Sequence, residues 1–546
     1  MVLSEHVNAE KLLSNLTNKG DEHAIRALIA SHTLRDPYSS KYNSQEPIPK
    51  FRIPDEGCEE KQAYQLITDD LDLDGKPNLN LASFVNTFIS DRAEKLAVEN
   101  LTKNLADADE YPALMTVHAR CVSILGHLWN NTDHEKAIGT ATTGSSEAIH
   151  LGGLAMKKRW QEKRRAAGKS TEKPNILMAA NAQVALEKFA RYFDVEDRII
   201  PVREASKHCL DLTKIKENLD ENTIGIFVIM GSTYTGHYED VQGVAKILDE
   251  YEKETGHSID IHVDGASGAM VAPFLYPDLE WDFRVPRVKS INTSGHKFGL
   301  TTAGLGWILW RDAKYLPKEL IFELHYLGGK EESYTLNFSR PGFPVLHQYY
   351  NFLHLGFDGY KQLHASSMAN ARLLSVFLEA TGHYTCVSEI HLPADGSKPK
   401  SGDVKHVATA DPLAYKAGLP VVAFRFSDSF KKAHPEVPQA AVSTLLRVKG
   451  YIVPNYELPP SEQTTEILRV VVRQSLSIDL LDRLMEDLSG ITNVLLQAVD
   501  DVKKLRKEGE HDPQLIHKYV LTLVTGKPVE EREEDWEGHS TFRAAC

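Results

Sequence analysis

Short apolar runs alternate with helical stretches through the middle of this chain. Six such runs, rich in Val, Ile and Phe, are NILMAA (175–180), DRIIPV (197–202), TIGIFVIMGS (223–232), SIDIHVDGAS (258–267), VKSINTSG (288–295) and GLGWILW (304–310). Buried runs separated by helical segments are typical of strands in a largely parallel sheet that has helices on both faces. The pattern therefore predicts an α/β fold with one large, mixed, mostly parallel sheet.

Helical periodicity flanks this region on both sides. Residues 81–129 are mostly helical in pattern, and ALMTVHARCVSILGHLW (113–129) repeats its apolar positions at three and four, which predicts one amphipathic helix. Further along, LHASSMANARLLSVFLEA (363–380) is again helical, and the strand-like runs LPVVAFRFS (419–427) and ILRVVVRQS (467–475) follow. These segments predict a smaller α+β domain after the large sheet.

The two ends of the chain differ from this centre. The N-terminal part is polar and rich in turn residues, which predicts an arm that needs another surface to lie on, such as a second subunit. The end, EEREEDWEGHSTFRAAC, is acidic, which predicts a disordered tail. The expected division is an N-terminal arm (1–80), a large domain (81–365), a small domain (366–505) and a tail (506–546).

Composition narrows the class of protein. The chain has 546 residues, enough for two or three domains, and its formal net charge of −14 argues against binding to nucleic acid. The cysteines are scattered without a CxxC pair, which argues against a disulfide framework or a zinc site and fits a reducing compartment; they are Cys58, Cys121, Cys209, Cys386 and Cys546. With no visible secretory signal and no apolar run near ~18 residues, we expect a cytoplasmic protein that does not enter a membrane.

Candidate chemistry lies where the predicted strands end, because open parallel sheets bind ligands beyond the carboxyl ends of their strands. Lys297 follows the run VKSINTSG among small residues, and partial burial there would favour the neutral amine, a nucleophile that can form a Schiff base. Asp264 ends another run 33 residues earlier, about one strand–connection–strand unit away. The spacing predicts that Asp264 and Lys297 enter one crevice from neighbouring strands.

Two interpretations of this pair differ in chemistry. A plain buried salt bridge would satisfy both charges. A pyridine ring between them would also do so, with Asp264 holding the ring nitrogen protonated and Lys297 bonding the aldehyde carbon, which is the arrangement of pyridoxal phosphate (PLP). A third motif favours the cofactor: in TTGSSEA (142–148), Ser145 and Ser146 open a predicted helix, and free amides and hydroxyls there would bind a phosphate.

With these motifs in place, the chain resembles the PLP-dependent glutamate decarboxylases of the bacterial and plant type, in the aspartate-aminotransferase fold superfamily. The resemblance extends from about residue 81 to residue 340, with further similarity into the small domain. It is carried by NLNLASFVNTF, TTGSSEA, EKFARYFDVE, STYTGHYE, HVDGASGAMVAPF, WDFRVPRVKSINTSGHKFGL and NFSRP. It implies the PLP-dependent transferase fold and decarboxylation of L-glutamate to 4-aminobutyrate (GABA) and CO2.

The resemblance also implies cofactor contacts at matched positions. Lys297 would be the Schiff-base lysine, with His296 near the phosphate, and Asp264 would pair with the pyridinium nitrogen. The remaining implied contacts are Ala266 and Gln183 on the two ring faces, Thr233 near the cofactor, Ser145, Ser146 and Ser294 at the phosphate, and Ser339 at the phosphate of the neighbouring subunit. The contact through Ser339 makes a homodimer the expected minimal active unit, and several relatives suggest a hexamer.

Substrate contacts follow from the same resemblance. Arg469 would hold the α-carboxylate of glutamate. The family binds the distal carboxylate with a Thr-Phe pair and a nearby Asn and Asp, which here fall on Ser83, Phe84, Asn104 and Asp107. Serine in place of threonine keeps the hydroxyl and loses a methyl group, so no reacting group is removed. Taken without the family, Phe84 would be a core aromatic residue and Asn104 a polar residue at a helix end.

Rival functions remain in view. One is a PLP decarboxylase for another amino acid; Gln183 argues against an aromatic substrate, because the related aromatic decarboxylases place a histidine there. Another is a catalytically silent scaffold, which intact Lys297 and Asp264 argue against. Plant relatives bind calmodulin through a basic C-terminal helix, but Trp536 is surrounded by acids, so we expect no calmodulin binding. In bacterial relatives a C-terminal histidine closes the site; His539 is the candidate counterpart, although a plain acidic end is the favoured interpretation.

Overall fold

The computed structural model describes residues 51–133, 137–324, 331–397 and 411–505. The chain divides into two compact units, 1–76 and 77–546. Within the first unit, helix α3 (Glu60–Leu71) buries none of its residues. The predicted tail with Trp536 and His539 lies outside the described residues. Within the described ranges, no helix is both long enough and apolar enough to cross a membrane.

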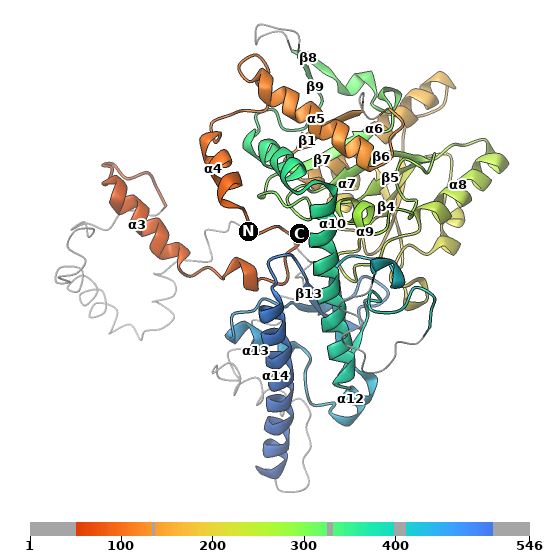
Figure 1. The fold of residues 1–546 in the computed structure, drawn as a ribbon. Coiled ribbons are helices and arrows are strands. Elements are labelled where there is room, and N and C mark those ends of the chain that lie inside the picture. The colour runs from red at the N-terminus through yellow and green to blue at the C-terminus, as the bar shows by residue number, and fades with distance from the viewer. Residues whose placement is uncertain (1–50, 134–136, 325–330, 398–410, 506–546) are drawn as a thin grey trace, which may run out of the picture. The chain divides into compact units, whose positions relative to one another are not determined.

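A seven-stranded sheet forms the centre of the second unit (Figure 1). In spatial order its strands are β1 (Ile138–Thr142), β7 (Gly306–Trp310), β6 (Val288–Thr293), β5 (Asp260–Asp264), β4 (Thr223–Ile229), β2 (Asn175–Ala179) and β3 (Glu196–Ile200). Strand β7 pairs antiparallel with both of its neighbours, and all other pairs are parallel. The predicted mixed, mostly parallel sheet is confirmed, and each of the six apolar runs overlaps one strand. Strand β1 was not predicted.

Helices cover this sheet. Helix α6 (Ser145–Ala166) packs across β7, β6, β5, β4 and β1, and α5 (Pro112–Leu128) packs on β1 and β7. The other helices of the large domain are α4 (Asp91–Glu99), α7 (Val184–Tyr192), α8 (Val241–Thr255) and α9 (Ala272–Leu275). The prediction of an amphipathic helix over 113–129 is confirmed by α5, but 81–90, part of the region with a mostly helical pattern, contains no helix.

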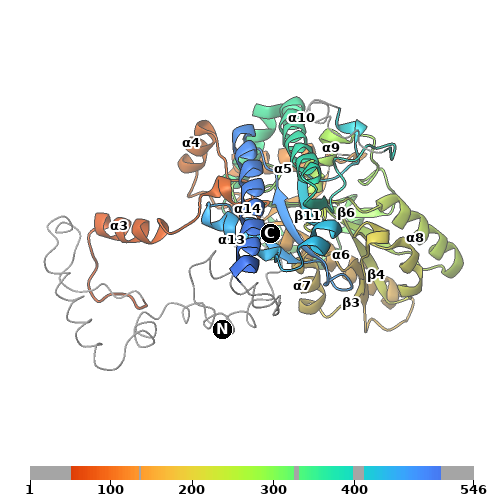
Figure 2. The same ribbon diagram turned by 90° about the horizontal axis from the view of Figure 1, so that it is seen from below.

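The small domain is built on a second sheet. Its antiparallel order is β10 (Tyr384–Cys386), β11 (Val421–Phe426), β13 (Glu466–Val471) and β12 (Asn455–Glu457). The accompanying helices are α10 (Phe343–Ala380), α12 (Asp428–Ala433), α13 (Ala440–Val448) and α14 (Ile478–Leu505), and Figure 2 shows α13 and α14 lying side by side. Helix α10 is broken at Gly356, where φ is +60°. This arrangement confirms the predicted smaller α+β domain.

Short elements complete the chain. Strands β8 (Phe322–Leu324) and β9 (Glu331–Ser333) pair antiparallel. Single 3₁₀ turns are η2 (Pro77–Leu79), η4 (Glu204–Ser206), η5 (Leu212–Lys214), η6 (Lys216–Asn218), η7 (Gly268–Met270), η8 (Ala313–Tyr315), η9 (Lys318–Leu320) and η10 (Pro412–Ala414).

An extended segment, residues 80–88, links the large sheet to the small domain, and we call it the strap. Its Leu81 N–H donates to Ile452 O at 3.0 Å, and its Leu81 O accepts from Val471 N–H at 2.8 Å. On the other side, Asn86 N–H donates to His296 O at 2.7 Å. The strap therefore lies between the small sheet and the loop that carries Lys297.

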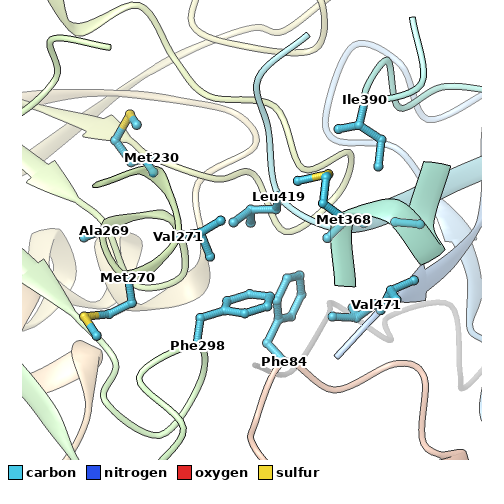
Figure 3. Packing of buried hydrophobic residues seen from close by; sticks show 14 of the residues in the cluster. Phe84, Met230, Ala269, Met270, Val271, Phe298, Met368, Ile390, Leu419 and Val471 are labelled. Carbon is cyan, nitrogen blue, oxygen red and sulfur yellow. The ribbon is translucent and has the colours of Figure 1, made fainter. Parts of the chain in front are cut away.

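One hydrophobic core is continuous across this junction. Figure 3 shows Phe84, which belongs to the strap, next to Phe298. The two rings pack edge to face, and their centroids are 6.5 Å apart. Leu419 and Val471 of the small domain lie close by in the same view. Close-packed side chains resist relative movement of the two domains, so the groups that each domain contributes are held in a defined geometry.

Candidate active site

Asp264 and Lys297 both enter one pocket from the carboxyl ends of neighbouring strands. Asp264 is the last residue of β5 and is 4% exposed, while Lys297 lies in the turn after β6 and is 2% exposed. The pocket is lined by Ser145, Ile149, Asn181, Gln183, Ile229, Gly231, Thr233, Asp264, Ala266, Ser267 and Lys297. The structure thus brings together both charged groups with Ser145, Gln183, Thr233 and Ala266.

The Asp264 carboxylate is held from behind by a chain of buried side chains. Its Oδ1 accepts the Asn292 Nδ2–H at 3.0 Å and the Ala266 backbone N–H at 3.1 Å. On the far side of Asn292 from Asp264, the Asn292 Oδ1 lies 2.7 Å from His262 Nε2. The His262 Nδ1 in turn lies 2.7 Å from Ser290 Oγ. The strand register explains the chain, because β5 and β6 pair His262 with Ser290 and Asp264 with Asn292.

In this series of hydrogen bonds, each side chain determines which atom of the next side chain carries the proton. A carboxylate only accepts hydrogen bonds, so Asn292 must turn its NH2 group toward Asp264 and its carbonyl oxygen toward His262. His262 must then carry its proton on Nε2 and accept from the Ser290 hydroxyl at Nδ1. Burial lowers the pKa of His262 to about 4, against the hydrogen bond to Asn292, so the ring is neutral near pH 7.

The charge on Asp264 depends on these contacts. Burial is the largest influence on its pKa and raises it. The Asn292 hydrogen bond, the Lys297 charge and the Ala266 hydrogen bond each oppose that rise. A buried carboxylate is costly without a cation or donors, and a protonated ring nitrogen at this position would supply the cation.

The start of α6 forms the other end of the pocket. Ser145 is buried at the first position of this 22-residue helix, and Ser146 beside it is exposed. The first backbone N–H groups of a helix have no intrahelical partner and attract anions. The approach of β7 is close, because a Cβ on Gly306 would lie 2.4 Å from the Gly144 carbonyl carbon. Only glycine at 306 therefore permits this turn.

His296 and Ser294 add polar groups from the loop after β6 that carries Lys297 (residues 294–301), which we call the lysine turn. The His296 Nδ1 accepts Leu305 N–H at 3.2 Å, so the neutral ring keeps its proton on Nε2 as a donor. Burial, followed by the Lys297 charge, lowers the pKa of His296 to about 4. Ser294 is fully buried, and its Oγ has no hydrogen-bond partner within the described residues.

These features fit a flat, phosphorylated pyridine ring. The carboxylate would face a cationic ring nitrogen, and the amine would face a carbonyl carbon. The helix start and the unpartnered hydroxyls of Ser294 and Ser267 would face a phosphate or a ring oxygen. Buried polar atoms in native proteins normally have partners, so unpartnered hydroxyls next to a pocket indicate that a polar ligand belongs there. The residues present therefore fit PLP.

Phe84 lies between the two cationic groups of the candidate substrate site. The Lys297 Nζ is 5.6 Å from the centroid of its ring, and the Arg469 guanidinium is 5.0 Å from it. Arg469, on β13, is 1% exposed and donates to Thr233 O and Ala82 O. Its Nε–H has no partner within the described part of the chain. Ser83 is half-buried, and its Oγ accepts Val85 N–H at 3.1 Å.

Asn104, Asp107 and Ser339 are not brought to this pocket. They lie together instead, with the Asn104 Nδ2 3.4 Å from Ser339 Oγ and the Asn104 Oδ1 accepting Arg340 N–H at 3.1 Å. Asp107 caps the next turn by accepting Glu110 N–H at 3.1 Å. Within one chain, the predicted substrate residues therefore form two groups, one at Lys297 and one around Ser339.

Sequence reasoning did not identify several groups that support the pocket. Arg473 donates to four oxygens of residues 77–87, which are those of Pro77, Asn80, Val85 and Thr87. Asn86 binds the lysine turn through Leu300 O at 3.0 Å and Thr301 O at 3.3 Å. Glu239 is buried, and its oxygens accept Ile229 N–H at 2.7 Å and Leu210 N–H at 3.0 Å.

A signal for one group was present in the sequence. His262 and Asp264 are two residues apart in one predicted strand, and Ser290 and Asn292 are two apart in the next. Residues at i and i+2 share a face of a strand, so polar residues at that spacing inside apolar runs indicate a polar network across neighbouring strands. The contacts of Arg473 and Asn86 have no comparable signal, because they join segments almost 400 and more than 200 residues apart.

Comparisons with known proteins agree with this geometry. Residues 61–394 match the family model described as the pyridoxal-dependent decarboxylase conserved domain. The chain is 49% identical to a glutamate decarboxylase of Saccharomyces cerevisiae over 90% of this chain and 87% of that protein. It is 44% identical to a glutamate decarboxylase of Solanum lycopersicum, over 92% and 95% of the two chains. Among solved structures, a Lactobacillus brevis glutamate decarboxylase superposes with a TM-score of 0.74 at 34% identity, over 83% of this chain and 97% of that one.

Proposed function

The chain belongs to the pyridoxal-dependent decarboxylase family, and from this premise we propose that it converts L-glutamate to 4-aminobutyrate and CO2 with PLP as its cofactor. The observation that carries the proposal is the identity of 49% to a glutamate decarboxylase over 90% of the chain, together with a buried lysine and aspartate in one pocket. When bound, PLP supplies the electron sink that accepts the bonding pair left by departing CO2.

The large domain would hold the cofactor. Asp264 would keep the ring nitrogen protonated, supported by the Asn292 hydrogen bond. The Lys297 amine would bond the carbonyl carbon and then, once released, carry a proton at Nζ to the substrate Cα. His296, with its proton on Nε2, and Ser294 would bind the phosphate beside the start of α6.

The strap and the small domain would hold the substrate. The free Nε–H of Arg469 would donate to the α-carboxylate, and Ser83 and the Phe84 backbone would bind the distal carboxylate. Fixing both ends of glutamate selects which Cα bond stands perpendicular to the ring, and that bond is the one that breaks. The strap therefore controls the choice of substrate, whereas the sheet supplies the reaction chemistry.

A homodimer as the minimal active unit accounts for the second residue group. Asn104 and Asp107 lie with Ser339 and not with Lys297 in the same chain, so we infer that all three serve the site of a neighbouring subunit. A mixture of inactive Lys297→Ala and Asp107→Ala proteins should then recover activity, because each mixed dimer contains one intact site. If the two variants are shown to exchange subunits and the mixture still has no activity, this inference is contradicted.

We also propose that the enzyme is cytoplasmic.

The function is tested by a substrate panel with added PLP. We expect CO2 release from L-glutamate and not from aspartate, tyrosine or cysteine sulfinate, and visible absorbance from the bound cofactor. Lys297→Ala should abolish both, whereas Lys289→Ala, on strand β6 before the turn with Lys297 and packed over Tyr315 at 4.9 Å, should retain both. Preferred turnover of another amino acid in the panel would replace glutamate as the substrate, and full turnover by Lys297→Ala would remove that residue from the mechanism.

A further inference from the structure

Three side chains with metal-binding atoms converge in the small domain. Glu379 lies near the end of α10, Cys386 ends β10, and His391 lies in the loop that follows. Their ligand atoms all lie within 4.8 Å of one another. None of the three lines the pocket that contains Lys297, so the proposed decarboxylase chemistry does not account for them.

His391 is the least satisfied of the three. It is 2% exposed, and neither of its ring nitrogens makes a hydrogen bond within the described ranges of the chain. Its Nε2 lies 3.3 Å from Glu379 Oε2, a contact that does not have hydrogen-bond geometry. Leaving a buried polar group unpaired is costly, so this ring is a group that a ligand would satisfy.

The other two groups are oriented toward the same space. The Glu379 Oε1 accepts the Cys386 backbone N–H at 3.3 Å, which leaves Oε2 for another partner. The Cys386 thiol makes one weak hydrogen bond, with Sγ 3.5 Å from Ser375 O. Glu379 keeps 39% of its side chain exposed, so the cluster is open to solvent on that side.

The backbone around the cluster is fixed. Cys386 pairs with Phe424 in the small sheet, and Ser388 Oγ donates to Thr235 O at 2.9 Å. Just before His391, Ile390 O accepts the Arg372 Nε–H at 3.0 Å. A preorganised set of ligands loses little conformational entropy on binding, which favours a specific site over a chance contact.

The donor set selects the kind of ion. One imidazole nitrogen, one sulfur and one carboxylate oxygen suit Zn²⁺, which prefers N and S ligands and takes four in tetrahedral geometry. Around Zn²⁺ such atoms stand about 3.5 Å apart, so each pair needs to close by at most about 1.3 Å from its present separation. A thiolate and a carboxylate together balance the charge of a divalent ion, and water can take the fourth position.

We propose that Glu379, Cys386 and His391 form a divalent-metal site that binds Zn²⁺. On binding, the Cys386 sulfur gives its proton to solvent, and bonds form from sulfur, nitrogen and oxygen to the metal without oxidation or reduction. The alternative is that Glu379 and His391 form an ion pair beside an unrelated thiol, and the two arrangements differ in whether the sulfur is needed.

Equilibrium dialysis of the chelator-treated holoenzyme against Zn²⁺ tests the site. We expect the wild type to bind one Zn²⁺ per chain more than Cys386→Ser or His391→Ala, with affinity at that site at least about tenfold weaker in Glu379→Gln. Cys58→Ser is the matched control, because Cys58 is an exposed free thiol and its loss should leave this zinc ion bound. These outcomes do not depend on which amino acid the enzyme decarboxylates.

Cobalt gives a second measurement that survives poor folding of the His391 variant. Bound Co²⁺ with a thiolate ligand should produce a charge-transfer band in the wild-type-minus-Cys386→Ser difference spectrum, with the PLP absorbance subtracted in both. Equal zinc binding by wild type and Cys386→Ser, or the absence of a cobalt–thiolate band, would overturn the proposal and leave the Glu379–His391 ion pair as the explanation.

Discussion

Replacing Asn292 by leucine should weaken PLP binding. As the pH is lowered, the variant should lose PLP at a higher pH than the wild type does. Leucine has a similar volume but cannot donate to Asp264, whose Oδ1 accepts the Asn292 Nδ2–H at 3.0 Å. The substitution also leaves the His262 Nε2–H without its acceptor in a fully buried position. The perturbation therefore acts on the charge of Asp264, although residue 292 does not line the cofactor pocket.

The magnitude follows from the contact that is lost. A hydrogen bond to a charged group contributes about 1.5–3 kcal/mol, and 1.4 kcal/mol corresponds to a factor of ten, so PLP affinity should fall about ten- to a hundredfold. The sign of the pH effect follows from the pKa of Asp264. Burial already raises that pKa and the Asn292 bond opposes the rise, so Asn292→Leu raises it further. A cationic ring nitrogen needs the carboxylate, so binding should weaken as pH falls, beginning at a higher pH in the variant.

The assay is the dissociation constant of PLP, measured by equilibrium dialysis across pH 5 to 8 on apoenzyme. Asn175→Leu is the matched control, since the Asn175 Nδ2 donates to the Asp220 carboxylate at 2.9 Å on a distant strand. It should lower stability without changing PLP affinity. A distance series adds a second test, with the effect falling from Asn292 to His262 to Ser290. The reasoning is refuted if Asn292→Leu binds PLP with the wild-type pH profile, or if Asn175→Leu weakens binding equally.

Three further predictions concern the surroundings of the pocket. Gly306→Ala should weaken PLP binding about five- to a hundredfold, because its Cβ would lie 2.4 Å from the backbone of Gly144 and overpacking costs about 1–3 kcal/mol. Burial raises the pKa of Glu239 from 4.5 to about 7. Protonated Glu239 therefore contributes on the order of 3 kcal/mol to the free energy of unfolding below about pH 4.5, and this contribution is lost as pH rises to about 7. The free energy of unfolding of Glu239→Gln should not show this decline. Arg473→Lys should raise KM for glutamate more than it lowers kcat, because lysine lacks the planar guanidinium with which Arg473 reaches four oxygens of residues 77–87.

Each of these three has a control of the same residue type. Gly490→Ala lies in open space on α14 and should leave PLP affinity unchanged. Glu250→Gln is exposed and should retain the wild-type slope of stability against pH. Arg447→Lys, also exposed, should keep the wild-type KM. A control that matches its partner variant would show that the effect comes from the type of substitution and not from the position.

The central sheet was predictable because six of its strands coincide with short apolar runs in the sequence. Strand β1 was not, since Ile138–Thr142 has the sequence IGTAT, with small and polar residues that show no apolar run. It is a strand because β7 offers it an antiparallel edge and because α5 and α6 pack against it. Its pairing partner is about 170 residues away, so local periodicity contains no information about it.

The strap shows the same limit at the site. NLNLASFVNTF has apolar residues at spacings that a helix also uses, so the pattern from residue 81 onward predicts mostly helix. The segment is extended because its carbonyl groups accept hydrogen bonds from Arg469 and Arg473 of the small domain. Lys297 and Asp264 were predictable because parallel strands bring their carboxyl ends together, whereas the second group, around Asn104, depends on contacts that a single chain's pattern does not contain.

The division between sheet and strap has a consequence for substrate choice. The groups expected to bind the cofactor come from strand ends and a helix start, which are rigid parts of one sheet, while those expected to bind glutamate come from the strap and β13. Phe84 joins the two sets, because its ring lies near both the Lys297 amine and the Arg469 guanidinium. A substitution such as Phe84→Leu should therefore change the ratio of kcat/KM between glutamate and other amino acids while PLP affinity stays near the wild-type value. If PLP affinity fell as much as glutamate turnover, the strap would be part of the cofactor site, and the separation of specificity from chemistry would be wrong.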